Sequence, residues 1–400
     1  MNQKLTLTHF KAKFREFAYK LYDYFLQNKK RQNLDNNSKI IFIGEYFPVR
    51  IQRLANLVGS DLQLEKVLYI SEWGYEPKLI GNAFDRIEIY RNSYDLKRRI
   101  NSENNIKLIH AFEPKAYFQF KIKNLVRAPF IYDLQDIIVT YYGFNPPLKW
   151  QKTNLLYEEK LFHLVDGFIA HSMELNEAQR LYKSRSVAQK RLFFPLFCNS
   201  ENFKPIVYKK IEDQINLVYI GGINAMKDHS SSNFLPFIKK LKTDVHLTIF
   251  PSPFSERLCF EEYKELEQIY PNFTIKHSVP FTQLNLTGFD FGVVPFEHEN
   301  SEKYYSKNKY ASTLKFFVYL EMGLPILISD YWAFPAWITK RYGIGIVTNY
   351  ENLDKTDFKI DEETYKIMLK NVEQFRNRFT LQANKNRLIE FYNSFLQSDK

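Results

Sequence analysis

Short apolar, β-rich segments alternate with longer segments of helical periodicity along most of this 400-residue chain. Such alternation is typical of βα units, which build parallel sheets covered by helices. Helical periodicity is clear at Val49–Val58 and from about Leu148 to Leu164. The strands expected in the first series are Ile40–Ile43, Val67–Ile70, Ile87–Tyr90, Leu108–His110, Phe130–Tyr132, Gly167–Ala170 and Leu192–Phe194.

A second series of the same kind follows a polar, proline-containing stretch from Pro195 to Gln214. Its expected strands are Ile215–Ile220, Val245–Phe250, Phe273–Ile275, Phe289–Val294, Ile326–Ser329 and Gly345–Val347, and two closing helices are expected at Glu362–Phe375 and Leu381–Leu396. The chain is thus divided into an N-terminal helix (1–38), a Rossmann-like domain (39–200), a linker (201–214), a second Rossmann-like domain (215–350) and closing helices (351–400). The fold expected is α/β, with two doubly wound domains facing a cleft, where such sheets bind ligands.

The charge balance favours anionic partners. Lys and Arg number 56 against 45 Asp and Glu, which gives a formal net charge of +11. Such an excess suits nucleic acid, an anionic membrane surface or phosphorylated small molecules. No nucleic-acid-binding motif is present, so we expect no nucleic acid partner. The two cysteines, Cys198 and Cys259, lack C-x-x-C spacing, and neither a metal nor another cofactor is expected.

The N-terminal segment (1–38) has a basic and aromatic character. It lacks the apolar core of a secretory signal, and no part of the chain approaches the ~18 apolar residues of a membrane span, so a cytoplasmic protein is expected. One helical face carries Phe10, Phe14, Phe17, Leu21, Tyr24 and Phe25, with lysines and arginines interleaved. This face either packs on the first domain or lies in a membrane interface. The second interpretation predicts a peripheral protein at the inner face of the cytoplasmic membrane.

The most specific motif is STLKFFVYLEMGLPILISD, which begins at Ser312. Ser312 or Thr313 can cap a helix, Gly323 can end it, and Pro325 opens a buried strand. Lys315 falls in the first turn, where its charge has the same sign as the helix dipole. Such a placement invites an anion, and a pyrophosphate would accept hydrogen bonds from both the helix N–H groups and the ammonium.

This motif resembles the donor-binding element of the glycosyltransferases with two Rossmann-like domains, the GT-B fold. It is most similar to the large retaining, family 4-like group, which uses nucleotide sugars to build surface glycans. The residues that match the family pattern K-L-F-E-Y-L-A-A-G-L-P-V-I are Lys315, Tyr319, Leu320, Gly323, Leu324 and Pro325. The family's glutamate for the ribose hydroxyls falls at Val318, which cannot accept those hydrogen bonds. Glu321, one helical turn onward, is the candidate substitute.

Further segments resemble the family's donor domain. A strand runs into the Gly221–Gly222 turn, which either lets the backbone approach phosphates or is simply a tight turn. Lys227 lies where the family often has a basic residue, and Pro295 follows a strand that precedes the nucleotide loop. The donor-binding residues that the resemblance implies are Gly221, Gly222, Lys227, Pro295, Thr313, Lys315, Tyr319 and Glu321.

The first half resembles the family's acceptor domain. His110 belongs to a strand that ends in an H-A-x-x-P turn, and Asp136 follows the next strand. Arg50 and Arg53 lie in a helix next to the expected acceptor. The alternatives are that His110 forms hydrogen bonds at the end of its strand and that Asp136 caps a helix.

The resemblance implies transfer of a sugar from a nucleoside diphosphate donor to a hydroxyl acceptor in bacterial surface glycan synthesis. The expected partners are a nucleotide sugar and a glycan or lipid-linked acceptor. Retention of anomeric configuration is expected rather than inversion, and Lys315, Asp136 and His110 are the catalytic candidates. In an inverting reaction Asp136 is the candidate base. Two alternatives stay open: a sugar-nucleotide epimerase, and a non-catalytic GT-B subunit, which Val318 favours.

Overall fold

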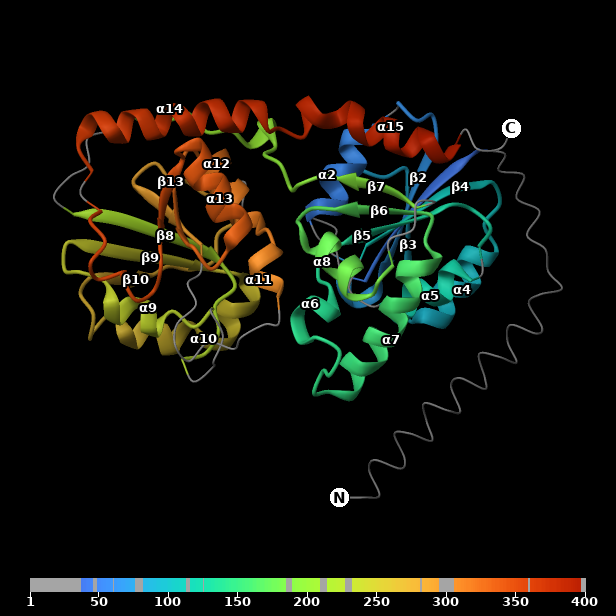
Figure 1. The fold of residues 1–400 in the computed structure, drawn as a ribbon, viewed down its shortest axis with the longest axis horizontal. Helices are drawn as coiled ribbons and strands as arrows, with labels where there is room; N and C mark the ends of the chain where they lie inside the picture. The colour runs from blue at the N-terminus through green and yellow to red at the C-terminus, as the bar shows by residue number, and fades with distance from the viewer. Residues whose placement is uncertain are drawn as a thin grey trace, which may run out of the picture.

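The computed structural model describes residues 37–45, 49–59, 61–75, 82–112, 116–124, 126–184, 189–208, 214–226, 232–280, 283–294, 306–358 and 360–396. The expected N-terminal helix and the candidate residues Lys227 and Pro295 lie outside these ranges. The described residues form two parallel sheets, each covered by helices on both faces (Figure 1). The predicted α/β architecture with two doubly wound halves is confirmed.

The first sheet has seven strands in the order β3-β2-β1-β4-β5-β6-β7. Their bounds are Lys39–Gly44 (β1), Glu65–Ser71 (β2), Arg86–Tyr90 (β3), Ile106–Phe112 (β4), Phe130–Leu134 (β5), Gly167–Ala170 (β6) and Lys190–Phe193 (β7). The helices of this half are Val49–Val58 (α2), Ser93–Asn101 (α4), Ala116–Lys123 (α5), Ile138–Tyr142 (α6), Lys149–Leu164 (α7) and Glu174–Leu181 (α8), with a 3₁₀ turn at Glu72–Gly74 (η1). Central strands such as β1 are buried along their whole length, because helices cover both faces.

The second sheet has six strands in the order β10-β9-β8-β11-β12-β13. Their bounds are Ile215–Gly221 (β8), Val245–Pro251 (β9), Phe273–Ile275 (β10), Phe291–Val293 (β11), Ile326–Ser329 (β12) and Gly345–Thr348 (β13). The helices are Leu235–Lys240 (α9), Pro253–Leu266 (α10), Lys307–Tyr310 (α11), Leu314–Glu321 (α12), Ala333–Tyr342 (α13) and Glu362–Arg378 (α14). Every strand predicted from the sequence is present in one of the two sheets.

The last helix, Lys385–Leu396 (α15), returns to the first half of the molecule (Figure 1). Leu388, Phe391 and Tyr392 join the core on the face of the first sheet that α2 also covers. Gly167 in β6 makes room for this helix, since a Cβ there would lie 2.5 Å from Cζ of Phe395. The sequence predicts the helix from its periodicity, which does not reveal the sheet on which the helix packs.

Two chain segments cross between the halves side by side. Cys198 of the first crossing donates its N–H to the carbonyl of Phe379 (3.0 Å), and its carbonyl accepts the N–H of Leu381 (2.8 Å). A 3₁₀ turn lies on each crossing, at Ser200–Asn202 (η2) and Gln382–Asn384 (η4). The junction is therefore a two-stranded connection rather than a single flexible linker.

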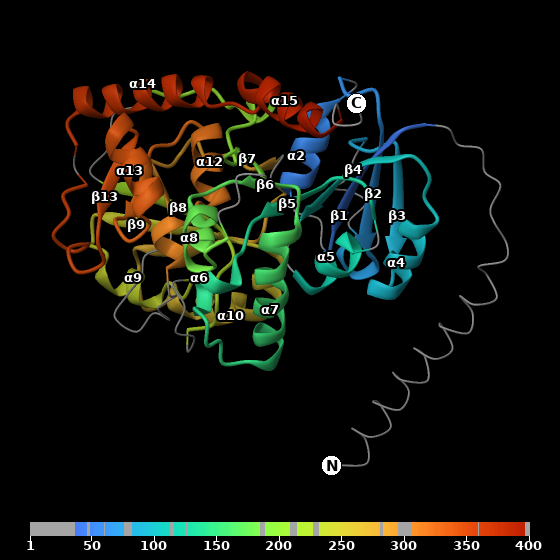
Figure 2. The same ribbon diagram turned by 45° about the vertical axis from the view of Figure 1, so that its right-hand side comes forward.

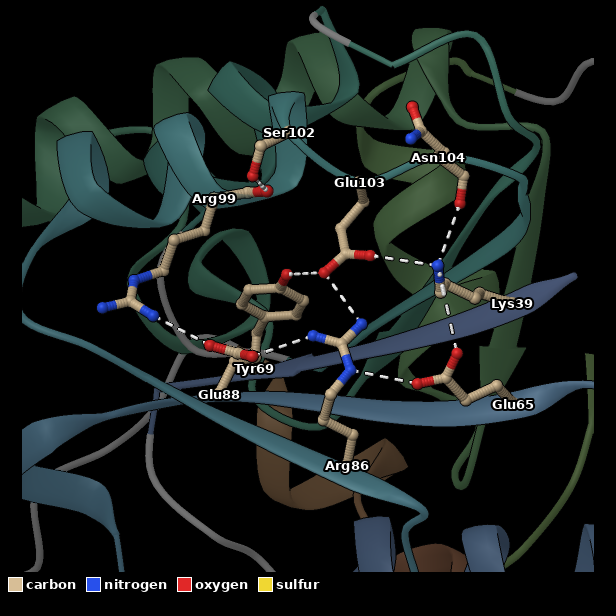
Figure 3. Close-up of polar contacts among 9 residues, drawn as sticks. All are labelled: Lys39, Glu65, Tyr69, Arg86, Glu88, Arg99, Ser102, Glu103 and Asn104. Carbon is tan, nitrogen blue, oxygen red and sulfur yellow. Dashed lines mark hydrogen bonds and ion pairs between the residues drawn. The ribbon is translucent and has the colours of Figure 1, made fainter. Parts of the chain in front are cut away.

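A network of charged side chains ties together the edge of the first sheet (Figure 3). Arg86 binds Glu65 (3.0 Å), Glu88 (2.8 Å) and Glu103 (2.8 Å). The phenol of Tyr69 donates to Glu103 (2.6 Å), and the ammonium of Lys39 lies 3.5 Å from the same carboxylate. The network joins strands β1, β2 and β3 to the chain that follows α4.

We expect this network to make the protein sensitive to acid. Burial opposes the charge of Glu103, but the hydrogen bonds from Tyr69 and Arg86 outweigh it and hold the pKa below its ordinary value. The resulting stability is present above the unfolded-state pKa of about 4.3 and is lost as pH falls through the lower folded-state value. Arg86→Met should lower the free energy of unfolding at pH 7 by roughly 2 kcal/mol and flatten this pH dependence. Urea unfolding at pH 7 and pH 3.5 measures both effects, and an unchanged pH dependence in the variant would contradict the assignment.

Candidate functional site

A glycine turn and a lysine meet at the carboxyl end of the second sheet. Gly221 ends β8 with φ = +120°, a conformation that side chains rarely allow. A Cβ at this position would lie 2.6 Å from Cε and 3.2 Å from Nζ of Lys315. Gly221 is therefore required by its backbone conformation, and the flexible end of Lys315 crosses the space next to it. The adjacent Gly222 has more room, because its nearest neighbour would be Oγ of Ser255 at 3.8 Å.

Lys315 presents a cation that no acidic side chain neutralises within the described part of the chain. Its Nζ lies 5.4 Å from the ring centroid of Tyr219, and burial lowers its pKa to about 8. Thr313 precedes α12 in extended conformation, and its side chain does not cap the helix. Oγ of Ser312 is buried and has no hydrogen-bond partner among the described residues. The ammonium, the helix start and this hydroxyl together suit an anion.

Tyr319 has a structural position in the core. Its hydroxyl accepts the N–H of Ile220 (3.0 Å) and donates to the carbonyl of Val293 (3.0 Å), and so joins β8 to β11. The ring lies against Gly292, where a Cβ would come within 2.2 Å of it. Both hydrogen bonds of the phenol are therefore used within the protein. Val318 is also buried.

Glu321 is fully buried at the junction between the halves. Its carboxylate binds both terminal nitrogens of Arg53 from α2, at 2.9 and 3.1 Å, and accepts the N–H of Asn199 at 2.7 Å. The sequence assigns Glu321 to a donor site and Arg53 to an acceptor site, whereas the structure brings them together in one ion pair. Glu321 lies six positions after Lys315 on α12, so the two side chains point about 120° apart around the helix axis. Glu321 therefore points toward the junction, on a different side of α12 from Lys315.

Arg50 and His110 surround an aspartate that the sequence interpretation missed. The Nε of Arg50 binds both oxygens of Asp133 at 3.0 and 2.9 Å, and its Nη2 donates to the carbonyl of Phe194. The Nε2 of His110 lies 3.3 Å from Asp133, and its Nδ1 lies 2.7 Å from the hydroxyl of Tyr392. Burial lowers the pKa of His110, against the opposing effect of Asp133. This group lies beneath α15, and His110 has no exposed surface.

Asp136 lies where the two halves meet, and 45% of its side chain is exposed. Lys307 of α11 contacts its carboxylate, and the hydroxyl of Tyr141 donates to it at 3.1 Å. The same ammonium lies 3.6 Å from the ring centroid of Tyr141. Burial raises the pKa of Asp136, but Lys307 outweighs this effect and the net shift is downward. Asp136 is thus an ionised carboxylate that is paired across the halves.

Backbone contacts support this second connection. The N–H of Ser306 donates to the carbonyl of Thr140 (2.8 Å), and the N–H of Met173 donates to the carbonyl of Tyr310 (3.0 Å). Near these contacts, burial raises the pKa of Glu174 to about 7, against the opposing effect of the Lys307 charge. The sequence motifs did not reveal Lys307, because its segment resembles no family element and its partner is distant in sequence.

The predicted site residues thus fall into separate groups. Gly221, Gly222, Thr313 and Lys315 lie together at the carboxyl end of the second sheet, and Asp136 lies at the facing edge of the first half. The other five described candidates are buried in ion pairs or hydrogen bonds: Arg50, Arg53, His110, Tyr319 and Glu321. Among the described residues, no group of three or more His, Cys, Asp or Glu side chains is placed to hold a metal ion. No helix in the described ranges is long and apolar enough to cross a membrane.

Two Rossmann-like halves, a double crossing between them and a returning C-terminal helix define the GT-B class of fold. Residues 228–386 match the protein family described as "Glucosyltransferase 3-like, C-terminal domain". This match and the fold confirm the prediction from sequence: the chain is a GT-B glycosyltransferase. No curated protein sequence matches it.

Several solved structures share the fold at low sequence identity. Anabaena Alr3699/HepE in complex with UDP-glucose is 12% identical, with a TM-score of 0.63, over 89% of this chain and 99% of that one. Sucrose-phosphate synthase from Thermosynechococcus elongatus is 13% identical, with a TM-score of 0.67, over 90% of this chain and 100% of that one. The apo form of the lipopolysaccharide outer core galactosyltransferase WaaB is 11% identical, with a TM-score of 0.54, over 89% and 99%.

Proposed function

We propose that this glycosyltransferase binds the pyrophosphate of a nucleotide sugar at Lys315, the Gly221 turn and the start of α12. The observation that carries this proposal is the partly buried ammonium of Lys315, which has no acidic partner among the described residues and lies at a helix N-terminus. When the glycosidic bond to the donor breaks, negative charge develops on the leaving diphosphate. A fixed cation and helix N–H groups stabilise that charge without a metal ion.

The transferred group is proposed to be a hexose or a related sugar, moved with retention of configuration. A carboxylate with a lowered pKa is a weak base, and Lys307 lowers the pKa of Asp136 despite the opposing effect of burial. This supports a retaining reaction, which needs no strong protein base.

The acceptor is proposed to be a glycan or a lipid-linked sugar of a bacterial surface glycan, bound between Asp136 and the donor. Uracil is the first base to test, since the similar HepE structure contains UDP-glucose.

A non-catalytic GT-B subunit is the second candidate. Val318 replaces the glutamate expected for the ribose, and Glu321 is already bound to Arg53. Neither residue is available to the ribose hydroxyls, so the base and the pyrophosphate must supply the donor affinity. This candidate predicts a protein that keeps the fold without binding or cleaving a nucleotide sugar.

The first experiment is a thermal shift against UDP, GDP, ADP, CMP and dTDP. A ligand at ~100 times its dissociation constant adds about 2.7 kcal/mol, which raises Tm by several degrees. A shift with one nucleoside diphosphate identifies the donor class. The corresponding nucleotide sugar is then incubated with the protein and an extract that contains acceptors, and release of the nucleoside diphosphate supports the transferase. Binding of none of the five would favour the non-catalytic subunit.

A further inference from the structure

The connection between α6 and α7 holds three large apolar side chains in solvent. Phe144, Leu148 and Trp150 are 50%, 51% and 53% exposed. We call residues 143–152 the α6–α7 tip. Figures 1 and 2 show this connection at the lower edge of the first half, projecting beyond the strands. Large apolar side chains gathered at a projecting turn are typical of a surface that contacts another apolar phase.

Local structure keeps the tip in this exposed form. Gly143 ends α6 with φ = +63°, and Pro146 and Pro147 restrict the turn that follows. The side chain of Gln151 accepts the N–H of Leu148 at 2.9 Å and so fixes the start of α7. Phe144 also packs edge-on against Tyr182, with ring centroids 5.9 Å apart. An ordered turn therefore presents the exposed parts of the apolar side chains.

The charge of the tip selects its partner. No acidic residue occurs from Ile137 to Tyr157, and the basic residues of that stretch, Lys149 and Lys152, are both exposed. A second exposed apolar pair exists on α10, where Phe254 and Leu258 are 64% and 68% exposed. That helix, however, carries Glu256, Glu261, Glu262 and Glu265. Of these two surfaces, the α6–α7 tip is the one that combines apolar side chains with purely positive charge, which is the combination that an anionic lipid surface attracts.

We propose that the α6–α7 tip inserts Phe144, Leu148 and Trp150 into the interface of an anionic lipid bilayer, with Lys149 and Lys152 among the lipid phosphates. Tryptophan at this depth has its ring at the headgroup level, where such rings are enriched. Helix α6, which contains Tyr141, connects the tip directly to the segment that contains Asp136. Binding of the tip to lipid does not depend on the donor site. The idea that this binding brings the enzyme to a lipid-linked acceptor rests on the proposed function.

Vesicle binding by the full chain tests the proposal. Co-sedimentation is measured with phosphatidylcholine vesicles that contain or lack phosphatidylglycerol. We expect binding only to the anionic vesicles and about tenfold weaker partitioning for Leu148→Ser/Trp150→Ser. Lys149→Gln/Lys152→Gln should weaken it by a similar factor. The matched control, Phe254→Ser/Leu258→Ser, removes an equally exposed apolar pair and should bind like the wild type.

Fluorescence quenching separates the tip from the basic N-terminal segment. A variant with Trp73, Trp332 and Trp337 replaced by Phe keeps Trp150 as its single tryptophan. We expect brominated acyl chains in anionic vesicles to quench Trp150 and its emission to shift to the blue. Vesicle binding without quenching would overturn the proposal, as would an absence of binding, which would instead favour a protein partner for the tip. Nucleotide thermal shifts on the same samples report the donor site independently.

Discussion

Lys315→Ala should lower kcat/KM for the nucleotide sugar by about 10²–10³ and remove the thermal shift produced by the matching nucleoside diphosphate. The side chain of Lys315 lies across the Gly221 turn, with Nζ 3.2 Å from the position that a Cβ of Gly221 would take. Without this ammonium, only the N–H groups at the start of α12 stabilise the negative charge that develops on the diphosphate. Steady-state kinetics and thermal shift measure the two effects.

The control for this variant is Lys309→Ala, which removes an exposed lysine of α11 and should leave both quantities unchanged. Binding of the nucleoside without phosphates should be equal in wild type and Lys315→Ala, because the lysine contacts only the phosphates in this proposal. Retention of diphosphate affinity within about threefold in Lys315→Ala would place the pyrophosphate elsewhere.

The same lysine predicts a pH dependence. Burial lowers the pKa of Lys315 to about 8, so the ammonium is present below this pH and is lost above it. Affinity for the diphosphate should therefore decrease as pH rises through about 8, and the decrease should be absent in Lys315→Ala. Binding titrations between pH 6.5 and 9.5 measure this difference. Because the bound anion raises the pKa of the lysine in the complex, the affinity begins to decrease near the pKa of the free protein, about 8, and levels off at the higher pKa of the complex.

The strands were predictable from sequence because each is a short apolar segment between helical segments, and burial on both faces requires that pattern. The place of α15 was not predictable, because helical periodicity gives the apolar face of a helix and not the sheet that receives it. Gly221 and Lys315 were found because adjacent sequence motifs carry them. The pairs Arg53–Glu321 and Asp136–Lys307 join residues far apart in sequence, so no local pattern reveals them.

Glu321 illustrates how a sequence motif and its three-dimensional setting diverge. A glutamate one turn past the family position suggests a substitute for the ribose ligand. In the structure, its carboxylate is satisfied by Arg53 and by the N–H of Asn199, and it has no exposed surface. We infer that the Arg53–Glu321 ion pair connects the two halves of the molecule. This role and a ribose contact predict different effects of mutation.

Arg53→Met should lower the free energy of unfolding by about 3–5 kcal/mol, because it leaves the charge of Glu321 buried without its partner. Glu321→Leu combined with Arg53→Met should recover a large part of this loss, since two apolar side chains replace the pair without a stranded charge. Urea denaturation of the wild type, both single variants and the double variant gives the coupling energy. If the pair connects the halves, the folded double variant keeps its affinity for the nucleoside diphosphate within about threefold. If Glu321 instead binds the ribose, the double variant loses nucleotide affinity although its stability is recovered.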